Sequence, residues 1–417
     1  MYRKLVLDNG VRVVTERIPT LKSVTVGIWV NTGSRDEQLS QAGYSHFIEH
    51  MFFKGTRTRS AADISREIDA LGGEMNAFTT RETTTFYVKV LDQQLKQAID
   101  LLADLFHHSG FDPKEIEKEK QVVLEEIRMV QDDPEDLVQE LHTGQVLARH
   151  PLGRSILGRE ETIRNLRRQD LMGYIDAHYD PTQIVIAIAG NFDQAVLMKM
   201  VARSFGNTKR AAGAGRITRR PPEVHGGVVT RKKQLEQVHL CLGLKGVAAG
   251  HRDRYAAYAL NSVLGGSMSS RLFQEVREKR GLVYSIYSFL SGYSDVGTIT
   301  VYAATRPKEV DRVVDLVCRE IGRIGKKGIE QKELARAKNQ MKGSLMLSLE
   351  SSHSRMSKLA KDELVYGTRT SLEDMLAHID RVTTDQVYAV GRQLFALERL
   401  AITGLGPLSS RALHAFR

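Results

Sequence analysis

The chain has 417 residues, a mass of 46.7 kDa and a net charge of +10 at neutral pH. This length exceeds what one hydrophobic core usually supports, so we expect two or more domains. Hydrophobic residues make up 41% and charged residues 26%, which is typical of globular proteins and argues against disorder. No apolar run reaches about 18 residues, so the sequence predicts no membrane span.

The basic charge is the first feature that bears on partners. Nucleic-acid binding would explain it, but the chain has no basic helix with interleaved aromatic residues and no nucleic-acid motif. We therefore interpret the positive charge as a solvated surface and predict no nucleic-acid partner.

The first residues of the chain predict structure rather than a targeting signal. Residues 1–16 predict two strands joined at an Asn9-Gly10 turn, with no apolar signal core and no leader rich in Arg and Ser. The two cysteines, Cys241 and Cys318, each lie in an apolar stretch, which suits a reducing compartment better than a disulfide framework. These features predict a cytoplasmic protein.

Two halves of the chain repeat the same order of predicted elements. Each half has a strand pair rich in Thr, Tyr and Val, a pair of helices, and a buried strand that enters a turn. In the first half these are residues 77–90, 91–127 and 184–193, and in the second half residues 289–304, 306–345 and 399–408. The order predicts an α+β fold with two repeated domains, each a mostly antiparallel sheet covered on one face by helices.

The segment 209–222 separates the two halves. It is rich in Gly, Ala and Pro and has no hydrophobic period, so it is the best candidate for a linker. The predicted domains are therefore residues 1–208 and residues 223–417.

The stretch Gly43 to Gly55, GYSHFIEHMFFKG, places His46, Glu49 and His50 in an otherwise apolar run. The second repeat has no such set. Against residues 46–55, residues 257–266 of the second repeat align Ala257 with His46, Leu260 with Glu49, and Asn261 with His50. Because the fold can form this helix without the three side chains, their presence favours chemistry over packing.

The spacing of the two histidines suits a metal. His46 and His50 are four residues apart, so both imidazoles project from one face of a helix and can chelate zinc. Glu49 can then contact a metal-bound water without being a ligand. The motif alone also fits a pair of core histidines that bond to neighbours, and a catalytic zinc site requires a third protein ligand.

The helix predicted around residues 115–129 supplies candidates for that ligand. Glu119 and Glu126 are seven residues apart on the side of its apolar stripe, and they align with Ala337 and Ser344 in the second repeat. We predict Glu126 as the third ligand, with Glu125 as the competing choice. Glu119 is then placed to orient one of the histidines.

At this point the sequence resembles a known family. His46-Phe-Ile-Glu49-His50, followed by Glu126 in VVLEEI, is similar to the inverted zinc motif of the pitrilysin-like or insulinase-like (M16) metallopeptidases. The stretches GGEMNAFTTRETTTFYV, HPLGRSILG, IVIAIAGN and GGSMSSRLFQEVREKRGLVYS resemble later landmarks of the family. At this length the chain resembles the half-size branch, which includes the mitochondrial processing peptidase β subunit and its bacterial homologues.

The resemblance implies a role for each matching position. It implies zinc ligation by His46, His50 and Glu126, with Glu49 as the general base and Glu119 as its supporting glutamate. It also implies three groups of residues that contact the substrate. They are an edge strand at Asn76, Ala77 and Phe78, an Arg277 and Tyr284 pair that reaches the substrate from a partner subunit, and an acidic pair for a substrate arginine at Asp136 and Glu140.

We therefore expect a zinc metalloendopeptidase that cleaves extended peptides or unstructured protein segments. The resemblance to the half-size branch also implies a homodimer, or a heterodimer with a related subunit, closed around a chamber. It implies that residues 1–208 form the catalytic, zinc-binding domain and that residues 223–417 form a repeat domain without metal that supplies half of the substrate chamber. Two alternatives compete with this interpretation. One is a non-catalytic subunit or scaffold, which would have lost the ligand set, and the other is a purely structural metal site, which has no use for Glu49.

Overall fold

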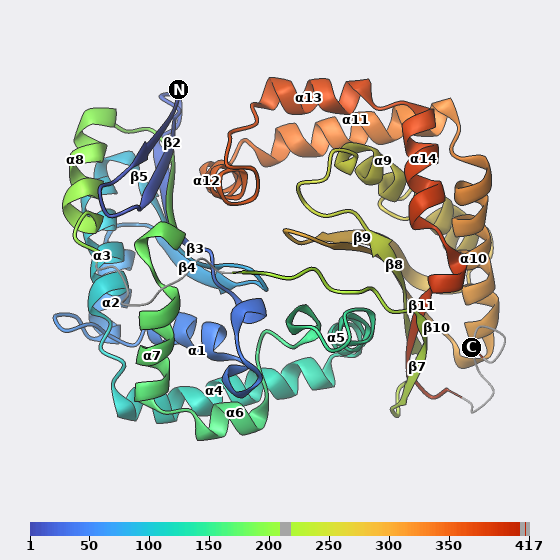
Figure 1. Cartoon of the computed structure of the whole chain (residues 1–417), viewed down its shortest axis with the longest axis horizontal. Helices are drawn as coiled ribbons and strands as arrows, with labels where there is room; N and C mark the ends of the chain where they lie inside the picture. The colour runs from blue at the N-terminus through green and yellow to red at the C-terminus, as the bar shows by residue number, and fades with distance from the viewer. Residues whose placement is uncertain (209–217, 409–412, 414–417) are drawn as a thin grey trace. The chain divides into compact units, whose positions relative to one another are not determined.

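The computed structural model describes residues 1–208, 218–408 and 413 (Figure 1). Its contacts divide the chain into two compact units. The first unit is made of residues 1–128, 154–219 and 348–369, and the second of residues 129–153, 220–347 and 370–417. Among the described residues, no helix is both long and apolar enough to cross a membrane.

The first unit is built on a six-stranded sheet. Its strands, in order across the sheet, are β1 (Tyr2–Val6), β2 (Arg12–Arg17), β6 (Ile184–Gly190), β3 (Ser23–Val30), β5 (Thr84–Leu91) and β4 (Glu74–Thr79). Only β2 and β6 pair in parallel, and every other pair is antiparallel. The sheet therefore ends at β1 on one edge and at β4 on the other.

The second unit repeats this arrangement, except that its described strands include no counterpart of β1. Its strands, in order, are β7 (Gly227–Lys232), β11 (Ala401–Gly406), β8 (Val238–Gly246), β10 (Gly297–Thr305) and β9 (Val283–Gly292). The one parallel pair, β7 with β11, occupies the place of β2 with β6. The predicted α+β class is confirmed, since both sheets are mostly antiparallel and the strand order repeats.

The described helices divide between the two units. In the first unit they are α1 (Tyr44–Met51), α2 (Ala61–Ala70), α3 (Leu95–His108), α4 (Pro113–Asp132, of which residues 129–132 belong to the second unit), α6 (Glu160–Asn165), α7 (Arg168–His178), α8 (Gln194–Phe205) and α12 (Ser352–Lys361). In the second unit they are α5 (Pro134–Val146), α9 (Arg254–Leu264), α10 (Val310–Lys327), α11 (Gln331–Ser348, of which Ser348 belongs to the first unit), α13 (Leu372–Arg381) and α14 (Thr384–Leu394).

Both sheets are covered on two faces, whereas the sequence predicted helices on one. The second face of the first sheet is covered by α12, where Trp29 and Val185 pack against Met356 and Leu359. The indole nitrogen of Trp29 lies 3.1 Å from the Met356 sulfur. Because both faces of β6 are buried, its sequence IVIAIAG is apolar throughout instead of alternating.

The second sheet receives α5 in the same way. Leu137 and Val138 of α5 pack with Tyr302 and Leu405, and Nδ1 of the buried His142 lies 2.8 Å from the Thr403 hydroxyl. Figure 1 shows α12 against the first sheet and α5 against the second. Each sheet thus buries its second face under a helix that comes from the other half of the sequence.

This exchange changes the domain boundaries. The prediction placed residues 129–153 in the N-terminal domain and residues 348–369 in the C-terminal domain, but each segment packs in the other compact unit. The apolar face of a helix has the same residue pattern whichever sheet it packs against. The hydrophobic pattern of residues 129–153 and 348–369 therefore does not reveal which sheet buries each segment. Of the predicted linker 209–222, residues 209–217 lie outside the described residues, and Arg219 forms an ion pair with Asp36 of the first unit (2.8 Å).

Candidate metal centre

Helix α1 carries the two histidines on one face and a hydrophobic anchor on the other. Phe47, Ile48 and Met51 are fully buried in the core beneath the first sheet. His46 and His50 project from the remaining face, where their side chains are 12% and 17% exposed. The apolar side therefore fixes the helix, and the histidines remain largely shielded but reachable.

Helix α4 brings the two predicted glutamates to the same place. Ile116, Val123 and Ile127 anchor α4 in the core, and Glu119 and Glu126 project on the side that faces α1. The Glu126 side chain is 35% exposed and that of Glu119 only 4%. Glu125, the competing ligand choice, instead forms an exposed ion pair with Arg128 at 2.8 Å.

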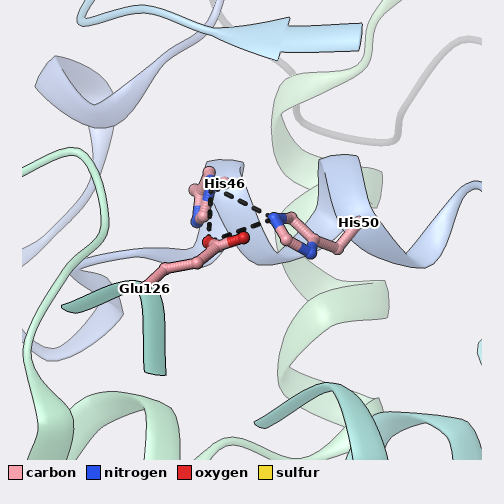
Figure 2. A group of neighbouring side chains, drawn as sticks. All are labelled: His46, His50 and Glu126. Carbon is pink, nitrogen blue, oxygen red and sulfur yellow. Dashed lines mark hydrogen bonds and ion pairs between the residues drawn. The ribbon is translucent and has the colours of Figure 1, made fainter. Parts of the chain in front are cut away.

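Three potential ligand atoms converge between these helices (Figure 2). His46 Nε2 and His50 Nε2 lie 3.2 Å apart, and Glu126 Oε2 lies 3.6 Å from the first and 3.5 Å from the second. Tetrahedral ligands held about 2.0–2.1 Å from zinc would lie about 3.3 Å from one another. Both the donor types and the spacing therefore fit a zinc ion, with a fourth position left for water or substrate.

Glu119 supports one histidine from behind. Its Oε1 lies 2.7 Å from His50 Nδ1, and its Oε2 forms an ion pair with Lys54 Nζ at 2.6 Å. Burial works to raise the pKa of Glu119, but the bonds from His50 and Lys54 outweigh it and lower that pKa. Burial likewise acts to lower the pKa of His50, yet the bond to Glu119 and the nearby carboxylates raise it. A carboxylate at Nδ1 leaves Nε2 free to bind a metal.

His46 differs from His50 in its surroundings. Burial lowers the pKa of His46 to about 3, helped by the charge of His50. This imidazole is therefore neutral at physiological pH, which is the state that ligates a metal.

Glu49 lies next to the three ligand candidates and has one specific partner. The Thr79 hydroxyl, at the end of β4, donates a 2.6 Å hydrogen bond to Glu49 Oε2. Burial raises the pKa of Glu49, and the Thr79 bond acts in the opposite direction. A carboxylate with a raised pKa is better matched to proton transfer near neutral pH.

Sequence reasoning missed Thr79 and Lys54. Thr79 lies two residues after Ala77 in the predicted edge strand, and Lys54 lies four residues after His50. Helix α1 ends at Met51, so its period does not place Lys54 against Glu119. Nothing in the sequence signals Thr79, because its contact with Glu49 is made between a strand and a helix.

The predicted substrate strand lies at an edge of the first sheet. β4 pairs with β5 alone among the described strands, and Asn76 is exposed. The Phe78 ring packs edge-on against Trp29, with the ring centres 5.4 Å apart. Its side chain therefore lies on the second face of the sheet, with the residues that contact α12. β4 forms one edge of this sheet, and the Ala77 N–H donates to the Asn76 side-chain oxygen at 2.8 Å.

The other predicted substrate residues belong to the second compact unit. Tyr284 is 79% exposed and lies beside Arg277, whose guanidinium is 5.3 Å from the ring centre. Arg277 also lies 3.9 Å from Glu278, which is the weak surface pair expected without a functional role. On α5, Asp136 is exposed and Glu140 half-buried. Burial and the acidic neighbours Asp133 and Glu135 raise the pKa of Asp136.

Two family models match consecutive parts of the chain. Residues 12–160 match the model described as insulinase, peptidase family M16, and residues 165–341 match the M16 inactive domain. The first range includes every residue of the candidate metal centre, and the two ranges together include every strand of the two sheets except β1 and β11.

Curated relatives match along almost their whole length. The chain is 44% identical over 407 residues to an uncharacterized zinc protease, YmxG, of Bacillus subtilis, covering 98% of each chain. It is 42% identical to an uncharacterized zinc protease of Streptomyces coelicolor, covering 98% of this chain and 90% of that one. The fold also matches the crystal structure of a protease from Helicobacter pylori, with a TM-score of 0.91 at 22% identity, covering 98% of this chain and 99% of that one.

Proposed function

Because the chain belongs to the insulinase family of zinc metallopeptidases, peptidase family M16, we propose that it is an endopeptidase for extended peptides and unstructured protein segments. The observation that carries this proposal is the grouping of His46, His50 and Glu126 within ligand distance of one another, beside Glu49. One zinc ion would be bound per chain, in the first compact unit.

The ligand roles follow from the contacts. His46 and His50 would bind the ion through Nε2 and Glu126 through Oε2, since these atoms converge. Glu119 would accept the Nδ1 hydrogen of His50 and hold its ring in position. When bound, zinc lowers the pKa of a coordinated water to about 7 and polarises the substrate carbonyl.

Glu49 would move the proton. It is not one of the three converging groups, so its carboxylate is free to take a proton from the attacking water and pass it to the leaving amine. The Thr79 hydroxyl donates to Oε2 of Glu49 and would hold the carboxylate in position. Tyr284 and Arg277 would stabilise the negative charge that develops on the carbonyl oxygen.

The substrate would bind as an added strand. An extended peptide would pair with the edge strand β4 along Asn76 and Ala77, where the Asn76 side chain would release the Ala77 N–H. Thr79, which bonds Glu49, lies at the end of the same strand. Asp136 and Glu140 are our candidates for holding a substrate arginine. Replacing Asp136 by Asn should then slow cleavage of arginine-containing peptides more than of peptides without arginine.

We further propose that two copies of the chain, or this chain and a related subunit, close around the substrate. A partner would supply Arg277 and Tyr284 to the metal centre. A protein that elutes as a monomer at micromolar concentration and still cleaves at its full rate would contradict this proposal. The proposed cytoplasmic location is supported by the two free cysteines, Cys241 and Cys318.

The direct test is cleavage of a quenched fluorescent peptide library with and without a strong chelator. We expect cleavage that the chelator abolishes and added zinc restores, and the library also reports side-chain preference. Cleavage that persists in the chelator, or no cleavage by protein that carries one zinc per chain, would contradict the proposed function.

A further inference from the structure

The first turn of α1 cannot be capped by its own N-terminal residue. Gly43 precedes the helix with φ +97°, and a Cβ there would lie 2.7 Å from the Leu157 carbonyl oxygen. Both constraints require glycine at a position where Ser, Thr, Asp or Asn usually caps the free N–H groups. Helix α1 is only eight residues long, so an uncapped first turn would leave much of it poorly held.

Glu37 supplies the missing cap from six residues upstream. Its Oε2 accepts the Gly43 N–H at 2.8 Å and its Oε1 accepts the Ser45 N–H at 2.7 Å. Glu37 itself is 4% exposed, and its backbone carbonyl accepts a 2.9 Å bond from Arg154. Burial raises the pKa of Glu37 to about 8, and the hydrogen bonds from the Ser45 and Gly43 N–H groups act to lower it. Because both oxygens accept N–H donors, the geometry favours the ionised carboxylate, which also complements the helix dipole.

The capped turn leads directly into the metal centre. Ser45, which donates to Glu37, precedes His46, and its hydroxyl lies 2.9 Å from the hydroxyl of the buried Tyr174. His46 and Glu49 follow within the next turn. A shift of the first turn would therefore displace a ligand and the general base together.

The second repeat again provides a comparison. Its counterpart helix α9 starts after Asp253, whose side chain makes no capping bond, and the Asp253 N–H donates to His251 Nδ1 at 3.1 Å. That helix has eleven residues, and none of them is among the three converging groups. The two-oxygen cap from Glu37 is therefore found on the helix that carries a candidate ligand and the candidate base.

We propose that Glu37 is a positioning residue for the metal centre, fixing the first turn of α1 and through it His46 and Glu49. This inference rests on the proposed function, because it assigns those two residues their roles in zinc binding and proton transfer. Glu37 touches neither the metal nor the substrate, and it acts only through the backbone of α1.

The test is Glu37→Gln in the full chain. An amide nitrogen in place of one oxygen would face a backbone N–H, so one of the two bonds is lost and a buried donor is left unsatisfied. We expect zinc affinity, measured by competition with a chromophoric chelator, to weaken about 10- to 100-fold, the range for groups that orient ligands. At saturating zinc, kcat on a quenched peptide should fall more than KM changes.

The matched control is Asp180→Asn in the same unit. Asp180 is also buried, and its Oδ1 accepts the Thr182 N–H and hydroxyl just before β6. We expect this variant to keep wild-type zinc affinity and kcat. Equal losses in both variants would mean that Glu37 is only structural, and would overturn the proposal.

Two further outcomes are distinguishable. If wild-type protein binds zinc but cleaves no peptide, the proposed function fails while the zinc affinity of Glu37→Gln still decides the role of Glu37. If circular dichroism shows that Glu37→Gln is unfolded, Glu37→Asp keeps the charge with a shorter reach and should weaken zinc binding by a smaller factor. Unchanged zinc affinity and kcat in a folded variant would overturn the inference.

Discussion

The two repeats share a strand order but differ in what their matching helices carry. In the first unit α1 and α4 present His46, Glu49, His50, Glu119 and Glu126. The aligned positions of the second unit are Ala257, Leu260, Asn261, Ala337 and Ser344. Leu260 and Ala337 are buried in the core of their unit. The fold is therefore satisfied by apolar or small side chains at these places, and the polar set of the first unit is an addition to it.

Burying these carboxylates costs free energy, and hydrogen bonds and ion pairs with neighbouring side chains offset that cost. A buried carboxylate without partners would be strongly unfavourable. Glu119 meets His50 and Lys54, and Glu49 meets Thr79. The second unit needs none of these bonds, so variants at matching positions should affect chemistry in one unit and stability in the other.

The largest effect is expected at Glu49. Replacing it by Gln removes the proton acceptor, so kcat should fall about 10²- to 10⁴-fold, the usual contribution of a general base. Zinc content, measured by atomic absorption on the same sample, should stay near that of the wild type. Unchanged cleavage would disprove this role and favour a structural metal site.

The aligned position in the second unit should respond through stability. Leu260→Ala removes a fully buried side chain from the core of that unit. The free energy of unfolding should fall by about 2–5 kcal/mol, as for other large-to-small core substitutions. Chemical denaturation followed by circular dichroism measures this loss, and a variant as stable as the wild type would show that Leu260 is not a packing residue.

Next comes the comparison of two adjacent glutamates on α4. Glu126→Ala should weaken zinc binding by more than about 100-fold, since losing a ligand exceeds the loss of a group that merely orients one. Glu125→Ala breaks only an exposed ion pair with Arg128, so zinc affinity should not change. The reverse result in chelator competition would assign the ligand to Glu125.

A smaller effect is expected at Thr79. Thr79→Val keeps the shape of the side chain but removes its hydrogen bond to Glu49, and kcat/KM should fall about 10-fold. Thr79→Ser restores the hydroxyl and should recover most of that activity. If the Val and Ser variants behave alike in the peptide assay, the hydroxyl has no role in holding Glu49.

The smallest expected effect is a pH dependence in the second unit. Burial lowers the pKa of His142 to about 3, whereas an unfolded chain protonates histidine near pH 6.5. Between these values the unfolded state binds one more proton, so stability decreases as pH falls, by at most about 1.4 kcal/mol per pH unit. Denaturation curves at pH 7 and pH 5 should differ less for His142→Gln than for the wild type. If stability changes equally between pH 7 and pH 5 in the wild type and in His142→Gln, His142 does not cause the pH dependence of stability.

Sequence patterns predicted much of the candidate site because its residues lie on two regular helices. Spacings of four on α1 and seven on α4 place His46 with His50, and Glu119 with Glu126, on one side of each helix. The three predicted ligands do converge. Glu37, Lys54 and Thr79 were missed because each acts by a contact that no helical or strand period encodes.

By itself the sequence determined the repeat, the α+β class and the residue types available for a metal, since all three follow from local period and spacing. Only the tertiary structure decided that α5 and α12 each cover a sheet of the other half, because an apolar helix face does not specify its partner. It also decided that a distant carboxylate caps α1 and that a strand hydroxyl holds Glu49. Hydrogen bonds depend on atoms within about 3 Å in space, whatever their separation along the chain.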